Sequence, residues 1–266
     1  MITNKTISFI GTGKMATALI GSIISSKMEV SLISSDKNEN NLNYVKNKFK
    51  IKTTKDNKEA VKNSDVIFLC VKPQNFPELL NEIKDEVKNQ LIVSIAAGIK
   101  TSKIESALKN ARVIRVMPNI NCLVGEAASG FCRGKYATKK DMEFVKAILD
   151  SSGISFEIKE KQIDVLSTIS GCGPAFFAYF IKHMANAASK KGIPREMAEK
   201  LAIQTLLGTG KLMLEKNITP DKLITMVASK KGVTLAGLNI LEKNKTGKIL
   251  EKMINAAYKR SIELGK

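Results

Sequence analysis

The chain has 266 residues, of which 44% are hydrophobic, and a formal net charge of +18 at pH 7. This length suits two domains, and the apolar share supports sizeable cores, so a globally disordered chain is excluded. A membrane span needs about 20 predominantly apolar residues. No uninterrupted apolar run approaches that length, so we expect no membrane partner.

The positive charge invites the hypothesis of nucleic-acid binding. Lysine dominates the basic residues, and these are spread along the chain without a long basic run. The sequence has no Trp and only four Tyr with which to stack on bases. We therefore interpret the charge as a solvated, lysine-rich surface and predict no nucleic-acid partner.

Cysteine usage indicates a reducing compartment. The four cysteines are widely spaced and form no C-x-x-C pair, which argues against a metal site and a disulfide framework; they are Cys70, Cys122, Cys132 and Cys172. The polar residues Thr3–Lys5 lead straight into the first predicted strand, so we expect no signal peptide. The prediction is a cytoplasmic protein without a metal.

Residues 7–24, ISFIGTGKMATALIGSII, read as a strand, a glycine turn and a helix. The turn has the dinucleotide fingerprint Gly11-x-Gly13-x-x-Ala16. Gly11 permits the tight turn, Gly13 lets the backbone approach a pyrophosphate, and Ala16 lets the helix lie close to the strand. The helix start points free N–H groups and its positive dipole end at the phosphates. The pattern predicts a dinucleotide site, the alternative being a tight turn that binds nothing.

The end of the next strand, predicted at 30–34, meets the adenine ribose in such folds. An acidic residue there selects NAD, whereas a hydroxyl with a cation accommodates the 2′-phosphate of NADP. The chain offers Ser34, Ser35, Asp36 and Lys37, which include both kinds of group. Because two hydroxyls come first and Lys37 follows, we predict NADPH and leave NADH open.

Strands and helices alternate as far as about residue 158. We predict helices at 39–49, 76–87 and 138–150, short ones capped by Asp56–Asn57 and by Thr101, and strands at 51–53, 65–71, 91–95, 112–117, 127–132 and 154–157. Residues 96–98 are small and leave room for a flat ring beside the sheet. This alternation predicts an α/β, doubly wound (Rossmann) sheet in residues 1–160, with ligands at the carboxyl ends of its strands.

Beyond residue 161 the pattern is helical throughout. Six helices are predicted, at 162–169, 174–191, 194–214, 220–228, 233–243 and 247–264. Proline opens three of them, at the first-turn position where it is tolerated. The helix from Pro174 is apolar nearly all round for two turns, and a domain of this size has little room to bury it. Residues 161–266 are therefore predicted to form an all-α dimerisation domain, with a core helix of the monomer as the alternative.

Several long sequence blocks carry a family resemblance that covers nearly the whole chain. These blocks are FIGTGKMA, DVIFLCVKPQ, VSIAAGI, RVMPNINCLVGEA, SGCGPAFFAYF, GIPREMAEKLAIQTLLGTGKLMLE and SKKGVTLAGLNILE. In this order they resemble the pyrroline-5-carboxylate reductases. The resemblance implies reduction of a carboxylate-bearing cyclic imine to L-proline with NADPH or NADH, the last step of proline synthesis. It also implies a homodimer through the helical domain, or a ring of such dimers.

The resemblance also implies site residues. Cofactor contacts are expected from Ile10, Gly11, Thr12, Gly13, Lys14, Met15, Ser34, Ser35, Lys37, Asn57, Val71, Lys72, Pro73, Ala96 and Ala97. The substrate site is expected to include Glu160, the Ser170–Pro174 turn with Cys172, Gly173 and Pro174, and the loop Gly232, Val233 and Thr234.

A protonated cyclic imine already accepts hydride readily, so the enzyme mainly has to place its carbon against the nicotinamide ring. The substrate carboxylate calls for N–H donors, which the helix start at Gly173–Pro174 and the loop Gly232–Thr234 supply. Thr234 adds a hydroxyl that can donate to the carboxylate or ring nitrogen. We assign no essential general acid.

The chain departs from the family pattern at Cys172, usually serine, at Lys182, usually acidic, and at Lys230–Lys231, usually Pro-Gly. These changes leave open a related imine substrate or a non-catalytic NADP-binding relative. Another alternative is a hydroxyacid dehydrogenase that uses Lys182, although this lysine lies more than two helical turns beyond Gly173, where the spacing is wrong. His183, inside the apolar helix, is interpreted as a packed or interface residue.

Overall fold

The computed structural model describes residues 3–264, and these form two compact units. The N-terminal unit runs to Gly171 and takes in the end of the last helix from Tyr258. The helical unit is Cys172–Ala257. The predicted boundary at 160/161 therefore lies before the point at which the chain leaves the N-terminal unit, because the turns that follow Glu160 still pack on the sheet.

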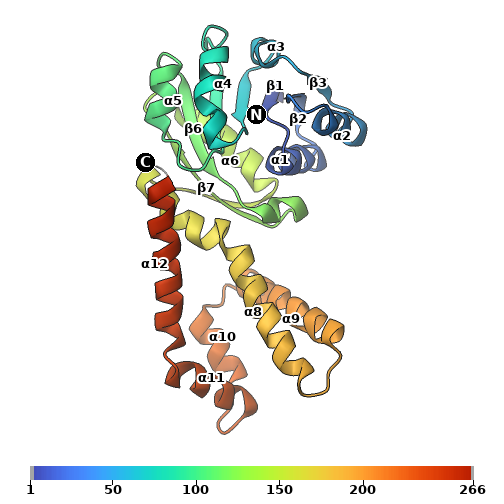
Figure 1. Ribbon diagram of the computed structural model, residues 1–266, viewed down its shortest axis with the longest axis vertical. Helices are drawn as coiled ribbons and strands as arrows, with labels where there is room; N and C mark the ends of the chain where they lie inside the picture. The colour runs from blue at the N-terminus through green and yellow to red at the C-terminus, as the bar shows by residue number, and fades with distance from the viewer. Residues whose placement is uncertain (1–2, 265–266) are drawn as a thin grey trace. The chain divides into compact units, whose positions relative to one another are not determined.

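One eight-stranded sheet with the order β3-β2-β1-β4-β5-β6-β7-β8 forms the centre of the N-terminal unit (Figure 1). The strands are β1 (Thr3–Ile10), β2 (Glu29–Ser35), β3 (Lys52–Thr54), β4 (Val66–Leu69), β5 (Leu91–Ser94), β6 (Arg112–Met117), β7 (Ala127–Arg133) and β8 (Gly153–Glu157). The first six are parallel, and β7 pairs antiparallel with β6 and parallel with β8. The short connection at 118–126 leaves no room for the crossover helix that a parallel partner needs. The predicted α/β Rossmann-type sheet is confirmed, with two reversed strands at one edge.

Seven α-helices belong mainly to this unit: α1 (Lys14–Ser25), α2 (Glu39–Phe49), α3 (Asn57–Lys62), α4 (Phe76–Ile83), α5 (Thr101–Ala107), α6 (Lys139–Asp150) and α7 (Ile163–Leu166). The Asp56 carboxylate caps α3 by accepting from the N–H groups of Lys58 and Glu59. Thr101, expected to cap α5, is instead its first helical residue, and Lys100 holds the cap position.

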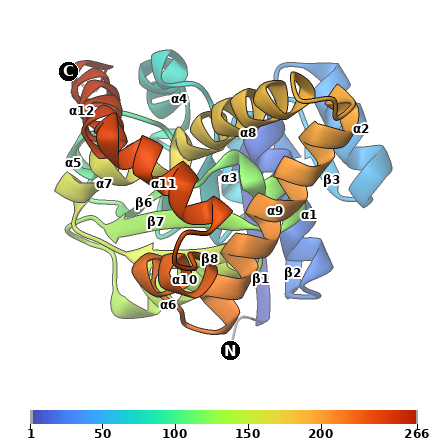
Figure 2. The ribbon, with the colours of Figure 1, turned by 90° about the horizontal axis from the view of Figure 1, so that it is seen from below.

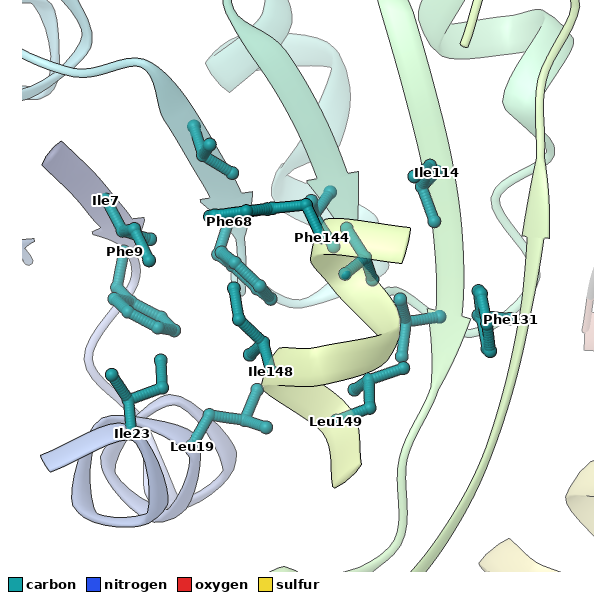
Figure 3. Close-up of a cluster of buried hydrophobic side chains, with 14 of the residues drawn as sticks. Ile7, Phe9, Leu19, Ile23, Phe68, Ile114, Phe131, Phe144, Ile148 and Leu149 are labelled. Carbon is teal, nitrogen blue, oxygen red and sulfur yellow. The ribbon is translucent and has the colours of Figure 1, made fainter. Parts of the chain in front are cut away.

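Two apolar layers hold these helices on opposite faces of the sheet. Alternate residues of β1 face opposite layers: Ile7 and Phe9 pack under α1 and α6, whereas Ile10 packs under α3 and α4. Figure 3 shows the first layer, where the Phe9 and Phe68 rings stack with centroids 4.8 Å apart. Burial of β4 and β5 on both faces explains their continuous apolar sequences.

The helical unit contains α8 (Gly173–Ser189), α9 (Arg195–Glu215), α10 (Pro220–Val227), α11 (Val233–Lys243) and most of α12 (Thr246–Leu264). A short turn joins α8 to α9, which packs against it (Figure 2). Many large apolar side chains are exposed, including Phe177 at 53% and Leu214 at 71%. Only Gly173, Ala185 and Ala198 are buried on α8 and α9. Within the described chain, α8 is therefore not a buried core helix of the monomer.

Within Glu160–Ser189, an 18-residue window reaches a mean hydropathy of 1.2, so this helical stretch is long and apolar enough to cross a membrane by length and composition. A helix that packs against protein passes the same test. This stretch also contains Asp164, whose carboxylate accepts a 3.0 Å hydrogen bond from Ser261 near the end of α12.

We predict that Ser8→Ala stabilises the protein. Ser8 lies in the middle of β1, is fully buried, and its hydroxyl has no hydrogen-bond partner among residues 3–264. An unpaired buried hydroxyl costs about 1 kcal/mol or more. The substitution should raise the free energy of unfolding by about 1 kcal/mol, as measured by urea denaturation followed by circular dichroism.

Ser155→Ala is the matched control, because the buried Ser155 hydroxyl donates to Asp150 at 2.5 Å. Its loss should lower stability by about 1–2 kcal/mol. A destabilised Ser8→Ala protein would contradict the assignment of an unpaired hydroxyl.

Candidate functional site

The turn after β1 is held against the end of β4. Gly11 has φ +92°, which favours glycine, and its N–H donates to the Ser35 carbonyl at 2.7 Å. A Cβ at Gly11 would lie 3.0 Å from backbone atoms of Cys70 and Val71. Both the backbone conformation and the close approach therefore require glycine here.

Gly13 precedes α1 and meets a different constraint. Its φ of −75° is open to any residue, and a Cβ there would meet nothing within 4 Å. No side chain caps α1, and its first turn contains no acidic residue. The start of α1 is therefore uncapped and the space beside Gly13 is open, which suits a pyrophosphate at the positive end of the helix dipole.

Thr12 ties this turn to the end of β2. Its N–H donates to the Asp36 carboxylate at 2.7 Å, and its hydroxyl lies 2.7 Å from the Ser34 hydroxyl. Ser35 donates to Asn57 at 2.5 Å. Both serines are fully buried between β1 and β3, so the structure does not bring Ser34 and Ser35 to the surface that a cofactor would touch, contrary to expectation.

Asp36 is the acidic residue that kept NADH possible as the cofactor. Its carboxylate accepts hydrogen bonds from three donors in the protein. Besides Thr12, the Asn41 amide donates to it at 3.1 Å and the Asn38 N–H at 2.8 Å. A carboxylate has about four acceptor positions. Asp36 therefore joins the glycine turn to the start of α2, and most of its capacity is already used.

A cavity of about 730 Å³ adjoins this turn, a size typical of ligand sites. Its lining includes six expected cofactor residues: Gly11, Gly13, Lys37, Asn57, Val71 and Lys72. It also includes residues that the sequence reasoning did not select: Asn38, Asn41, Cys70, Gln74, Asn75, Glu78, Leu79 and Glu82. Glu78 and Glu82 are one helical turn apart on α4, just beyond the carboxyl end of β4, and that spacing could have identified them.

Not every expected cofactor residue lines this cavity. Ile10, Thr12 and Ala96 are buried, whereas Ala97, at the carboxyl end of β5, is exposed. Lys14, Met15 and Pro73 also lie outside the lining. A larger cavity of about 930 Å³ lies over β2, β3 and α2, but no residue of the glycine turn lines it.

Lys37 pairs with Glu78 across the cavity, with Nζ 2.7 Å from the carboxylate and both side chains exposed. The hydrogen bond to Glu78 raises the pKa of Lys37, and the same bond lowers the pKa of Glu78. Both groups are therefore charged at neutral pH. Burial raises the pKa of the Cys70 thiol, which keeps it protonated and a poor nucleophile.

Glu160 was expected at the substrate site, but its carboxylate is already bonded to other residues of the protein. Its carboxylate accepts from the Thr101 N–H at 2.8 Å and from the Thr101 hydroxyl at 3.1 Å. The buried Arg115 lies 3.5 Å away as its ion-pair partner. These contacts fasten the turn after β8 to the start of α5, so Glu160 positions this region.

Asn119 was missed by the sequence reasoning, although it lies in the quoted RVMPNINCLVGEA block. Its buried amide donates to the Ser170 carbonyl at 3.1 Å and accepts from the Ala128 N–H at 3.2 Å. Ser170 belongs to the π-helical turn Ser167–Gly171, and such turns often occur at functional sites. Asn119 therefore orients the chain just before Cys172.

The remaining expected substrate residues lie at two helix starts of the helical unit. Cys172 precedes α8, which opens with Gly173 and Pro174, and Gly232 precedes α11. The Gly232 N–H closes a turn on the Ser229 carbonyl at 3.0 Å, with Lys231 at φ +58°. Neither helix start has a side-chain cap.

The structure of one chain does not bring these two helix starts together. In Figure 1, α11 lies at the opposite end of the helical unit from the start of α8. Val233, the first residue of α11, is 93% exposed. On α8, Lys182 and His183 are exposed as well, and the His183 ring lies 4.2 Å from the Tyr179 ring.

Comparisons with known proteins agree on one family. Residues 160–264 match the model described as pyrroline-5-carboxylate reductase dimerisation, and residues 6–98 match NADP oxidoreductase coenzyme F420-dependent. The pyrroline-5-carboxylate reductase of Methanosarcina acetivorans is 38% identical over 99% of both chains. The Coxiella burnetii reductase structure has a TM-score of 0.94 at 30% identity, covering 98% of this chain and 99% of that one. The Plasmodium falciparum reductase with NADP bound has a TM-score of 0.88 at 30% identity over 100% of both chains.

We predict that Gly13→Val abolishes binding of the expected NADPH without disturbing the fold. The Cβ of the new side chain has no protein atom within 4 Å, and the side chain fills the space in front of α1. Fluorescence titration with NADPH should show no saturable binding, while the unfolding temperature stays nearly unchanged.

Gly11→Ala provides the contrast, since the strained φ and the contact with the Cys70–Val71 backbone should lower the unfolding temperature. Unchanged NADPH affinity in Gly13→Val would contradict the assigned pyrophosphate position.

Proposed function

Because the chain belongs to the pyrroline-5-carboxylate reductase family, we propose that its two units divide the family's reaction between them. The reaction is reduction of 1-pyrroline-5-carboxylate to L-proline with NADPH. The N-terminal unit holds the cofactor, and the helical unit holds the substrate carboxylate. The observation that carries this assignment is the uncapped start of α1, which directly follows Gly13 in the lining of the cavity.

The residues at this end of the sheet suit a dinucleotide. NADPH supplies the hydride when it is bound. The start of α1 and the close-packed Gly11–Thr12 turn hold the pyrophosphate, and Thr12 keeps the turn in place through Asp36. Small side chains at Ala96 and Ala97 leave room for a flat ring at the end of β5.

The helix starts of the helical unit suit the substrate carboxylate. The first N–H groups of α11 and the Thr234 hydroxyl can donate to it, and the start of α8 at Gly173–Pro174 offers a second set of donors. A protonated cyclic imine is already electron-poor. These residues therefore act by orientation, and no general acid is required.

Two copies of the chain are needed to bring these donor sets together. The starts of α8 and α11 lie at opposite ends of one helical unit, whereas a second copy can present its own α11 start. Exposed apolar side chains on α8 and α9 provide the surface for that pairing. We propose a cytoplasmic homodimer, or a ring of such dimers. The four unpaired cysteines fit a reducing compartment.

We predict that the purified protein is at least a dimer at micromolar concentration. The apolar surface of α8 needs a covering partner, since exposed patches of this kind mark interfaces. Multi-angle light scattering should give a mass of at least twice the 29.1 kDa of one chain. A monodisperse monomer would contradict the proposed assembly.

We predict that Thr234→Val lowers kcat/KM for the imine about ten- to a hundredfold. The substitution keeps the shape of the side chain but removes one hydrogen bond to a charged group, worth roughly 1.5–3 kcal/mol. Calorimetry should show unchanged NADPH affinity, because the cofactor contacts lie in the other unit.

Lys182→Met separates this proposal from a hydroxyacid dehydrogenase. That enzyme class would lose its chemical step, whereas the imine reductase should keep most of its rate. A relative without activity would reduce no imine in any form of the protein. A dead Lys182→Met variant beside a normal Thr234→Val variant would show that the reaction is wrongly assigned.

A further inference from the structure

The cavity beside the glycine turn is richer in acidic than in basic side chains. Three carboxylates, those of Asp36, Glu78 and Glu82, line it together with the ammonium groups of Lys37 and Lys72. A cavity for a cofactor with an extra phosphate is expected to carry surplus positive charge. The acidic lining therefore calls for an explanation.

The three carboxylates differ in what holds them. Asp36 accepts three hydrogen bonds from the glycine turn and α2. Glu82 accepts from the Asn57 amide at 3.0 Å, and Asn57 in turn accepts from Ser35. Among residues 3–264, Glu78 bonds only with Lys37. Unlike Asp36 and Glu82, Glu78 therefore does not help to hold the glycine turn or the strand ends in place.

Lys37 lies at the position where this fold would bind the extra 2′-phosphate of NADPH. In this fold the residue beyond β2 meets the adenine ribose, at its 2′ position. Lys37 comes two residues after Ser35, the last residue of β2. Its Nζ is nevertheless turned toward α4, where Glu78 holds it at 2.7 Å.

We propose that Glu78 sets the selectivity between NADPH and NADH by competing with the 2′-phosphate for Lys37. A 2′-phosphate has to displace Glu78 from Lys37 and then lies near an unpaired carboxylate. NADH has a neutral hydroxyl at this position and meets neither cost. Glu78 thus lowers the preference for NADPH and keeps NADH usable. This inference rests on the proposed function, because it assumes that a nicotinamide cofactor occupies this cavity.

The exposure of both side chains makes the exchange feasible. Exposed ion pairs are individually weak, since water screens them and two flexible side chains have to be ordered. A phosphate with close to two negative charges can therefore replace the single charge of Glu78 at Lys37. We expect the effect of Glu78 on selectivity to be about three- to tenfold.

The test is direct binding of the oxidised cofactors, measured by calorimetry on the full-length protein in low-salt buffer. Glu78→Gln removes the charge and keeps the size of the side chain. We expect the Kd for NADP⁺ to fall about three- to tenfold and the Kd for NAD⁺ to change by less than about twofold. The gain in NADP⁺ affinity should be smaller in high salt. Salt screens both the repulsion between Glu78 and the 2′-phosphate and the attraction of Glu78 for Lys37.

Two further variants make the result specific. Lys37→Met should weaken NADP⁺ selectively. In the Lys37→Met background, Glu78→Gln should improve NADP⁺ binding less than it does alone, because competition for Lys37 is gone. Glu86→Gln is the charge-matched control: it breaks the 3.4 Å ion pair with Lys62 outside the cavity and should leave selectivity unchanged.

The possible outcomes separate this inference from the proposed function. Normal binding of both cofactors with unchanged selectivity in Glu78→Gln would overturn the role of Glu78 alone. Equal gains for NADP⁺ and NAD⁺, or the same selective gain in Glu86→Gln, would also overturn it. Failure of the unmodified protein to bind either cofactor would overturn the proposed function and this inference with it.

Discussion

The approach of the Gly11 backbone to the Cys70–Val71 peptide is the constraint on which the glycine-turn end of the sheet depends. It lets β1 and β4 lie side by side while the chain turns sharply into α1. The turn is then locked from the other side by Thr12, which bonds both Asp36 and Ser34 at the end of β2. Three strand ends thus meet at one fixed turn, and this turn places the uncapped start of α1 beside the open space at Gly13.

In the helical unit, by contrast, the main feature is an apolar surface that a single chain leaves exposed. Its helices bury almost nothing apolar among themselves, although α8 and α9 carry many large apolar residues. The hydrophobic effect therefore favours association of this unit with another surface. If that surface is a second copy, as we propose, the pairing that stabilises the helices also assembles the donors around the substrate carboxylate.

Local sequence patterns predicted most elements because their causes are local. The helix at 39–49 and the strand at 112–117 have the predicted bounds, since Asn38 caps the first and Pro118 follows the second. The helix predicted at 76–87 ends at Ile83 although no Gly or Pro marks that point. The reversed strands β7 and β8 were also not predicted, because strand direction depends on the length of the connections.

The sequence by itself determined the family, the Rossmann sheet and the glycine turn, because backbone conformation and helix periodicity depend on residues that are close together in the chain. Only the tertiary structure decided which polar groups are free to act. Ser34, Ser35 and Glu160 looked available in the sequence, but they are already bonded to Thr12, Asn57 and Thr101, which are distant in the chain. The Lys37–Glu78 pair likewise joins residues on separate elements. Such pairings depend on how strands and helices pack, and no local pattern records them.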